Sequence, residues 1–148
     1  MDKKKIIRIV IVCCLGLFIL GFLNRPTTEQ KIYKFVEENE SELEEIAINY
    51  LNGDVRDKKY KFVEVDGVFT NPNSESIVQF FYKGTGIVPA CKYYGFYYSP
   101  TNKPVDYQNC GFHLEEDNGV WSWHEGNSDN GGITKKISDC WYYYEAWF

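Results

Sequence analysis

The sequence predicts an α+β protein: an N-terminal transmembrane helix, then one long amphipathic helix packed on a twisted antiparallel β-sheet. Three observations lead to this prediction. An apolar run opens the chain, a segment with helical periodicity follows it, and segments rich in aromatic and β-branched residues fill the remainder. The chain has 148 residues, 18% of them aromatic, so it is long enough for one domain and too rich in rings to stay unfolded in water.

Residues 6–23 are almost entirely apolar, with Arg8 as their one charged member. As a helix, this run would rise about 27 Å, close to the hydrocarbon thickness of a bilayer. Positive charges cluster before it. We therefore predict a cytoplasmic basic tail over 1–5, a single-pass transmembrane helix over 6–23 and an extracytoplasmic domain over 24–148. A cleaved signal peptide is the alternative, although the residues after the run are bulkier than a cleavage site requires.

The charge balance excludes one class of partner. The whole chain carries 16 Lys and Arg against 21 Asp and Glu, a formal net charge of −5. Residues 26–148 hold 11 of the basic and 20 of the acidic side chains, so the predicted extracytoplasmic domain has a balance of −9. A nucleic-acid-binding surface has to be cationic to displace counterions from phosphates. We therefore expect no nucleic-acid partner.

A long helix is predicted over 27–51. Thr27 and Gln30 have the spacing of a capping box at its start, and Asn52-Gly53 supplies a stop. Between these signals, apolar residues recur at spacings of three and four and form one stripe: Ile32, Phe35, Val36, Leu43, Ile46, Ala47 and Tyr50. The opposite face is rich in glutamate, and we interpret it as a solvated face rather than a cation site.

From residue 58 onward the pattern becomes that of strands, so the sheet is predicted over 58–148. Turn-forming residues separate the strand-like segments. The predicted strands cover 60–69, 76–83, 91–99, 105–108, 112–115, 120–124 and 140–148. No crossover helix intervenes, so an antiparallel meander is expected. By analogy, a long helix on such a sheet has the general shape of cystatin-like and nuclear-transport-factor-like rolls, a likeness that carries no function by itself.

Aromatic residues occupy both faces of the predicted sheet, because the runs 93–98 and 141–144 contain rings at successive positions. One face can pack beneath the helix. The other must expose its rings or be covered by a loop, another strand or a partner. Tyrosine suits a recognition surface because it offers a large area with few rotatable bonds. We therefore predict that the binding surface contains Tyr94, Tyr97, Tyr98, Tyr142 and Tyr144.

A tight hairpin is predicted at Asn118-Gly119, the preferred pair for a type I′ turn. A two-residue loop then sets three opposite pairs: Asp117 and Val120, Leu114 and Trp123, His113 and His124. Both histidines of the chain would share a face with Glu115, and two imidazoles with a carboxylate can hold zinc. A polar solvent-exposed face explains the same pattern. His113, His124 and Glu115 are therefore weak candidates for metal ligands, and no cofactor is predicted.

Three cysteines lie in the predicted extracytoplasmic domain: Cys91, Cys110 and Cys140. An oxidising compartment favours one disulfide and leaves one thiol over. The turn over 99–104 is expected to bring the strands that carry Cys91 and Cys110 side by side, so we predict that pair, while the other two pairings stay open. Cys140 would then be buried or bridge two chains.

The sequence contains no Gly-x-Ser-x-Gly, His-Glu-x-x-His or phosphate-loop motif. Together with the predicted anchor and the surplus of rings, this favours a membrane-anchored, non-catalytic extracytoplasmic domain that binds a protein partner. The alternative is a domain that binds glycans by stacking on Trp and Tyr, or hydrolyses them with carboxylates of the hairpin region: Glu115, Glu116, Asp117 and Glu125.

Overall fold

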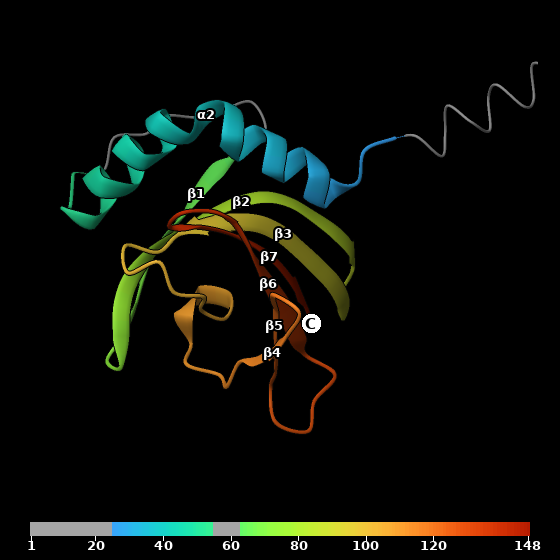
Figure 1. The fold of residues 1–148 in the computed structure, drawn as a ribbon. Helices are drawn as coiled ribbons and strands as arrows, with labels where there is room; N and C mark the ends of the chain where they lie inside the picture. Colours follow the sequence, from blue (N-terminus) through green and yellow to red (C-terminus); the bar gives the residue numbers. More distant parts are fainter. Residues whose placement is uncertain (1–24, 55–62) are drawn as a thin grey trace, which may run out of the picture.

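The computed structural model describes residues 25–54 and 63–148. In these residues one long helix lies across one face of a seven-stranded antiparallel sheet (Figure 1), so the predicted α+β class is confirmed. The predicted basic tail over 1–5 and transmembrane helix over 6–23 lie outside the described residues. Within the described ranges, no helix combines the length and apolar character that a membrane crossing requires.

Helix α2 (Thr28–Leu51) begins and ends where the sequence predicts. The Thr27 hydroxyl accepts the backbone N–H of Gln30 at 3.2 Å, and the Gln30 side chain accepts the backbone N–H of Thr27 at 2.9 Å, which completes the capping box. At the other end Asn52 is the C-cap, and Gly53 follows with a positive φ of 80°. The buried residues of the helix all belong to the predicted stripe: Ile32, Val36, Leu43, Ile46 and Ala47.

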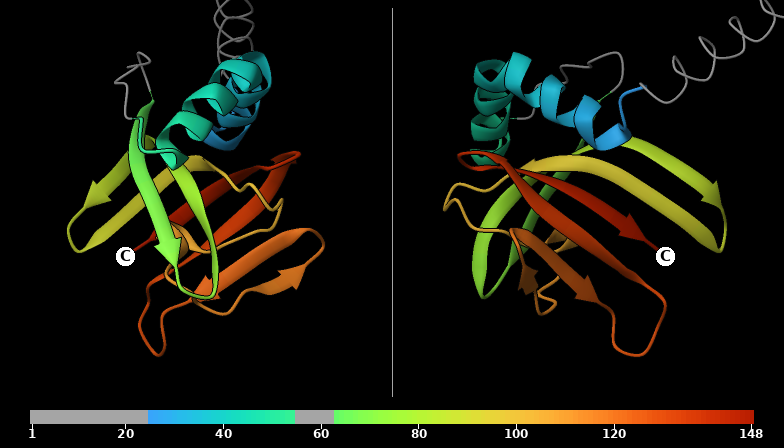
Figure 2. Two further views of the ribbon diagram at one scale, coloured as in Figure 1. Left: turned by 90° about the vertical axis from the view of Figure 1, so that its left-hand side faces the viewer. Right: turned by 45° about the vertical axis from the view of Figure 1, so that its right-hand side comes forward.

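The sheet contains the strands β1 (Glu64–Asn71), β2 (Ser74–Ile87), β3 (Ala90–Tyr98), β4 (Glu115–Asp117), β5 (Val120–His124), β6 (Gly131–Ser138) and β7 (Trp141–Trp147). Their order across the sheet is β1-β2-β3-β7-β6-β5-β4, so the predicted continuous meander is wrong. Two meanders, β1 to β3 and β4 to β7, are joined because β7 pairs with β3. The chain between β3 and β4 passes beneath the face of the sheet opposite α2 (Figure 2), and this return places the last strand at the centre.

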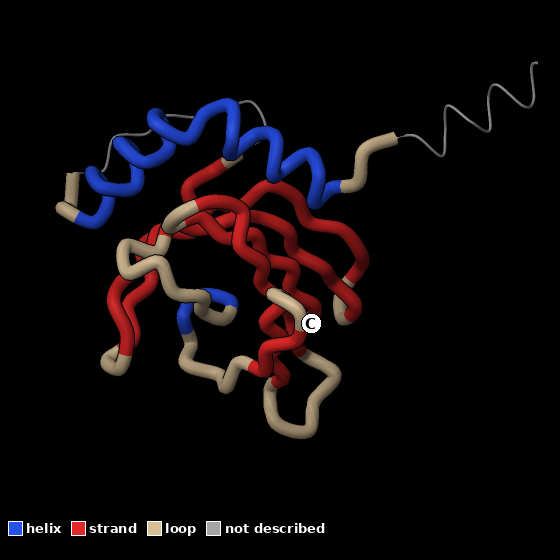
Figure 3. The backbone as a smooth tube through the Cα atoms, viewed as in Figure 1, coloured by secondary structure: helices blue, strands red, loops and turns tan. Residues whose placement is uncertain are grey.

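Two of the predicted strands are replaced by other structure. Residues 105–108 belong to a loop that contains the short 3-10 helix η1 (Tyr107–Asn109), and 112–114 stay in loop up to the start of β4 (Figure 3). Conversely, β6 lies between the predicted strands 120–124 and 140–148, where no strand was predicted. Gly131 and Gly132 resemble turn residues in sequence, yet a Cβ on Gly132 would lie 2.5 Å from the Trp123 indole nitrogen and 2.7 Å from the Glu145 carbonyl. The strand needs glycine there because Trp123 packs directly against its backbone.

Both faces of the sheet carry a buried cluster. In the cluster beneath α2, the apolar stripe of the helix packs on buried rings from the helix-facing side of the sheet: Phe80, Phe96, Trp141 and Tyr143. The cluster on the other face, which we call the inner cluster, consists of Ile77, Tyr97, Tyr142 and Tyr144, with Phe69, Tyr93, Val105, Tyr107 and Trp121 packed against it. Val105 and Tyr107 come from the connection between β3 and β4. A loop of the chain itself therefore helps to cover the second ring-bearing face, which is one of the possibilities that the sequence left open.

Asn109 fastens this connection to the β1–β2 hairpin. Its side-chain amide donates to the carbonyls of Phe69 (3.3 Å) and Glu75 (3.1 Å), and its side-chain oxygen accepts the Ser74 hydroxyl at 2.8 Å. Asn109 is 4% exposed and has a positive φ of 53°, a conformation that asparagine tolerates better than most residues. One side chain thus satisfies three polar groups of a neighbouring hairpin.

Replacing this side chain, as in Asn109→Ala, is expected to lower the free energy of unfolding by about 1–3 kcal/mol, because the buried side chain makes three hydrogen bonds that the variant loses. Urea unfolding of the purified chain, followed by tryptophan fluorescence, measures the change. Asn73→Ala in the exposed turn of the same hairpin is the matched control, with an expected change within about 0.5 kcal/mol. Equal stabilities of the two variants would contradict the assignment.

Candidate binding site

The five tyrosines predicted to bind a partner lie on both sides of the sheet. Tyr97, Tyr142 and Tyr144 belong to the inner cluster, where Tyr97 and Tyr142 stack at 5.3 Å with an interplanar angle of 9°. Tyr98 is buried beneath α2, where its hydroxyl donates to Glu44 at 3.2 Å, and the half-buried Tyr94 packs against the same cluster. Four of these rings are buried because each face of the sheet is covered. The five do not form one exposed surface.

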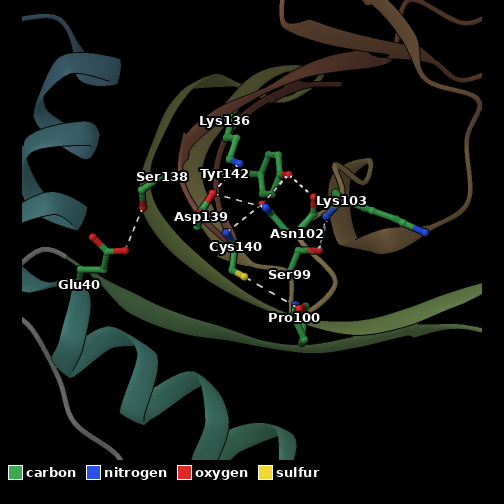
Figure 4. Close-up of polar contacts among 10 residues, drawn as sticks. All are labelled: Glu40, Ser99, Pro100, Asn102, Lys103, Lys136, Ser138, Asp139, Cys140 and Tyr142. Carbon is green, nitrogen blue, oxygen red and sulfur yellow. Dashed lines mark hydrogen bonds and ion pairs between the residues drawn. The ribbon is translucent and has the colours of Figure 1, made fainter.

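The three cysteines of the described domain are free thiols, and the predicted Cys91–Cys110 bond is not formed. That pairing depended on a strand beside β3 that would carry Cys110. Instead β7 occupies the position next to β3, and Cys110 follows η1 in the loop. Cys140 lies in the turn between β6 and β7, where its backbone N–H donates to the Asn102 side chain at 3.0 Å (Figure 4).

The predicted hairpin register is confirmed at its turn. Asp117 lies opposite Val120, and Asn118 and Gly119 have positive φ values of 52° and 78°, as a type I′ turn requires. The ladder stops at Glu115, so the expected pairs of Leu114 and His113 with β5 do not form. It is Phe112 that stacks on Trp123, at 5.1 Å.

The weak metal candidates His113, His124 and Glu115 are not brought together. Without the expected continuation of the ladder, His113 stays in the loop before β4. His124 lies against the indole of Trp147, with ring centroids 6.4 Å apart. Over the two described ranges, no group of three or more His, Cys, Asp or Glu side chains has an arrangement that could hold a metal ion.

The carboxylates of the hairpin region serve local turns. Glu116 accepts the backbone N–H of Gly119 at 3.0 Å, and Glu125 accepts the side-chain amide of Asn130 at 2.7 Å. The buried carboxylate elsewhere in the described chain is Asp106, which accepts the backbone N–H groups of Gly111 and Phe112. Burial raises the pKa of Asp106, and those N–H groups oppose the rise. Asp106 therefore closes a loop through these hydrogen bonds.

Exposed apolar side chains gather at one end of the sheet. Among the described residues, the large hydrophobics with the greatest exposure are Ile87 (86%) and Val88 (82%), at the tip of the β2–β3 hairpin, and Phe148 at the end of β7 is 38% exposed. Beside the tip lies a cleft of about 410 Å³ with mainly apolar walls. Its lining, which we call the terminal cleft, consists of Ala90, Cys91, Lys92, Asp129, Trp147 and Phe148.

The pairing of β3 with β7 builds the walls of the terminal cleft. Cys91 and Phe148 exchange two backbone hydrogen bonds of 3.0 Å, which fixes the end of the chain against the start of β3. The Phe148 ring reaches the inner cluster, with its centroid 5.5 Å from that of Tyr107. This wall is therefore continuous with the core and does not depend on the β2–β3 tip for support.

Lys92 carries the positive charge at the cleft. Its ammonium group lies 2.8 Å from the Glu145 carboxylate and 5.7 Å above the ring of Trp147. The hydrogen bond to Glu145 raises the pKa of Lys92, so the side chain stays charged. Asp129, from the loop between β5 and β6, adds an acidic side chain to the lining. The lining of the cleft thus combines a half-buried indole with side chains of both charges.

Sequence reasoning missed this site because it brings together residues from β3, β7 and the β5–β6 loop. Trp147 and Phe148 fall inside a correctly predicted strand, but their position at the sheet's end depends on the long-range β3–β7 pairing. One local signal was present. Residues 84–90 contain no charge and include two aliphatic side chains in a hairpin turn, where polar residues are usual.

A second hollow, of about 420 Å³, lies between the β1–β2 turn and the loop after β3. Its lining is chiefly short polar side chains and prolines: Pro72, Asn73, Ser74, Glu75, Ser99, Thr101, Lys103, Pro104 and Val105. No large ring lines it, so it offers less apolar contact than the terminal cleft.

The fold and the cleft together define an α+β domain with an apolar cleft at one end of its sheet. Comparison of the chain with models of protein families, with curated proteins and with solved structures finds no match.

Proposed function

We propose that the chain is a membrane-anchored extracytoplasmic domain that has no catalytic role and binds a protein partner through the terminal cleft. The anchor is the apolar run over 6–23, which is long enough to cross a bilayer as a helix. The single observation that carries the binding function is the cleft itself: a mainly apolar hollow between Trp147 and Phe148, at the end where exposed hydrophobics gather.

The chemistry of the cleft favours a protein segment as its occupant. A hollow of about 410 Å³ takes one or two large apolar side chains, and tryptophan is enriched among residues that dominate binding energy. The acidic balance of residues 26–148 favours a partner whose binding segment is basic around an apolar anchor residue, because complementary charge speeds association and rejects other partners.

The experiment is capture of the partner from the membranes of the source cells by the full chain in mild detergent. Wild type is compared with Trp147→Ala, which removes one of the two aromatic rings that line the cleft. Loss of a central binding residue costs about 2 kcal/mol or more, so capture should fall by about thirtyfold. Val68→Ala is the matched control, since Val68 is also an exposed hydrophobic (40%) but lies on β1 away from the cleft.

Quantitative mass spectrometry of the captured proteins measures the effect, and thermal unfolding checks that both variants fold. Equal capture by wild type and Trp147→Ala would overturn the assignment of the cleft. A glycan array probed with the same three proteins separates the alternative function. Binding to a glycan that Trp147→Ala abolishes, without any protein lost from the capture, would replace the protein partner with a sugar.

A further inference from the structure

The tip of the β2–β3 hairpin is the most exposed apolar segment of the described chain. Ile87 is 86% and Val88 82% exposed, and Pro89 follows them. From residue 84 to residue 90 the chain carries no charge. Water-exposed aliphatic side chains at a protruding tip gain free energy when they enter an apolar medium, about 25 cal/mol for each Å² removed from water.

The tip is held by the sheet rather than being a loose loop. The β2–β3 ladder continues to its last pair, in which Ile87 lies opposite Ala90. Gly86 has a φ of 102°, and a Cβ there would lie 2.1 Å from the Ala90 carbonyl oxygen, so the strands approach closely just below the tip. Ile87 and Val88 are therefore presented at a fixed position with few conformations to lose on binding.

The location of the tip relates it to the start of the described chain. Figures 1 and 2 show that α2 begins at the same end of the domain as the β2–β3 tip, whereas the β1–β2 turn lies at the opposite end of β2. The described chain starts at Arg25, two residues after the end of the run over 6–23 that the proposed function assigns to the membrane. A domain tethered at this end presents the tip toward the bilayer that holds its anchor.

We propose that Ile87, Val88 and Pro89 insert into the outer surface of the anchoring membrane and hold the domain against it. This inference rests on the proposed anchor, and its ligand is a lipid surface. Two exposed lysines accompany the tip: Lys83 lies four residues before Ile87 on β2, and Lys92 lies four residues after Val88 on β3. Four strand residues extend about 13 Å, so Lys83 reaches the headgroups when the tip enters the upper acyl region, while Lys92 stays paired with Glu145 beside the cleft.

The insertion also orients the proposed partner site. Ala90 and Lys92 belong both to the base of this hairpin and to the terminal cleft. With the tip in the bilayer, the cleft opens just above the membrane surface. Its partner is then expected to offer a membrane-proximal segment.

The test places a tryptophan at the tip of the full chain, reconstituted in vesicles of phosphatidylcholine and phosphatidylglycerol. Ile87→Trp is compared with Asn73→Trp, at the exposed turn on the opposite end of β2. Lipids brominated in the upper acyl chain quench a nearby indole by contact. Relative to wild type, the emission added by Ile87→Trp should fall by about half with brominated lipid, for a side chain about 5–10 Å deep, and that added by Asn73→Trp should be unchanged.

Flotation of the vesicles separates failure of this inference from failure of the anchor. If the full chain does not float with the vesicles after alkaline washing, the anchor is wrong and the inference falls with it. If it floats and neither added tryptophan is quenched, only the insertion of the tip is overturned. Emission of Ile87→Trp that shifts to the blue as the protein-to-lipid ratio rises, without quenching, would assign the tip to a second copy of the chain and overturn the lipid proposal.

Discussion

Raising the pH toward 12 is expected to unfold the domain cooperatively, because its buried tyrosines cannot ionise in place. Burial raises the pKa of Tyr97, Tyr143 and Tyr144 above the ordinary value of 10.0, and each of them is at most 2% exposed. Desolvation also raises the pKa of Tyr33 and Tyr107 to about 12. In the unfolded chain the same phenols ionise near pH 10.

Because the pKa of each of these tyrosines is higher in the folded state, the stability of the domain falls as the pH rises. A group whose pKa is higher in the folded state stabilises that state fully below its unfolded pKa, and the contribution is lost as the pH rises toward the folded pKa. By pH 11 each fully buried tyrosine removes about 1.4 kcal/mol, so Tyr97, Tyr143 and Tyr144 together remove about 4 kcal/mol. Domains of this size are stable by about 5–15 kcal/mol, so unfolding between about pH 11 and 12 is expected.

Tyrosinate absorbance at 295 nm and far-ultraviolet circular dichroism, followed together during titration, measure this transition. The two signals should change together in one steep step. Tyr144→Phe is the informative variant, because the buried Tyr144 hydroxyl has no hydrogen-bond partner among the described residues. Removing it should raise both the stability and the alkaline midpoint. Gradual tyrosinate formation near pH 10 in a chain that keeps its circular dichroism would contradict the prediction.

Gly95→Ala is expected to destabilise the domain by about 3 kcal/mol or more, at the upper end of the cost of overpacking a core. A Cβ at position 95 would lie 2.1 Å from the Phe80 carbonyl oxygen and 2.6 Å from the Tyr144 hydroxyl. The first of these atoms belongs to the backbone of the neighbouring strand and cannot move without breaking the β2–β3 ladder. The glycine therefore lets β2, β3 and the Tyr144 ring approach closely on the inner face.

Gly84→Ala provides the matched control on the adjacent strand. Its Cβ would meet the rings of Phe81 and Tyr93 at 3.6 Å, an ordinary van der Waals distance. This variant should therefore keep the stability of wild type within about 1 kcal/mol. Urea unfolding of both variants by circular dichroism measures the difference, and a Gly95→Ala chain as stable as Gly84→Ala would disprove the close approach.

The features predicted from the sequence are those whose signals are local. The capping box at Thr27 and Gln30 needs only a spacing of three, and the type I′ turn at Asn118-Gly119 needs only its two residues. The capping box correctly predicted where α2 begins, and the turn correctly predicted the pairing of β4 with β5 next to it. The rings at successive positions of 93–98 in β3 and 141–144 in β7 likewise predicted aromatic residues on both faces.

The features that the sequence did not predict depend on residues far apart in the chain. Residues 105–108 resemble a strand in composition, but Asn109 bonds to the β1–β2 hairpin and the segment becomes a cover over the inner cluster. That cover helps to bury Tyr97, Tyr142 and Tyr144, three of the five tyrosines that were predicted to bind. The terminal cleft forms only where Cys91 meets Phe148, a contact for which neither segment carries a local signal.

The central position of β7 has a consequence for the order in which the domain forms. Every strand but β7 is synthesised before the two halves of the sheet can be joined, since β7 alone lies between β3 and β6. Until it arrives, β3 and β6 each present a row of unpaired backbone groups, and such rows recruit strands from other chains. The nascent protein therefore completes its native sheet late. A chain released before β7 is complete would expose the unpaired edges of β3 and β6, which can pair with strands of other chains.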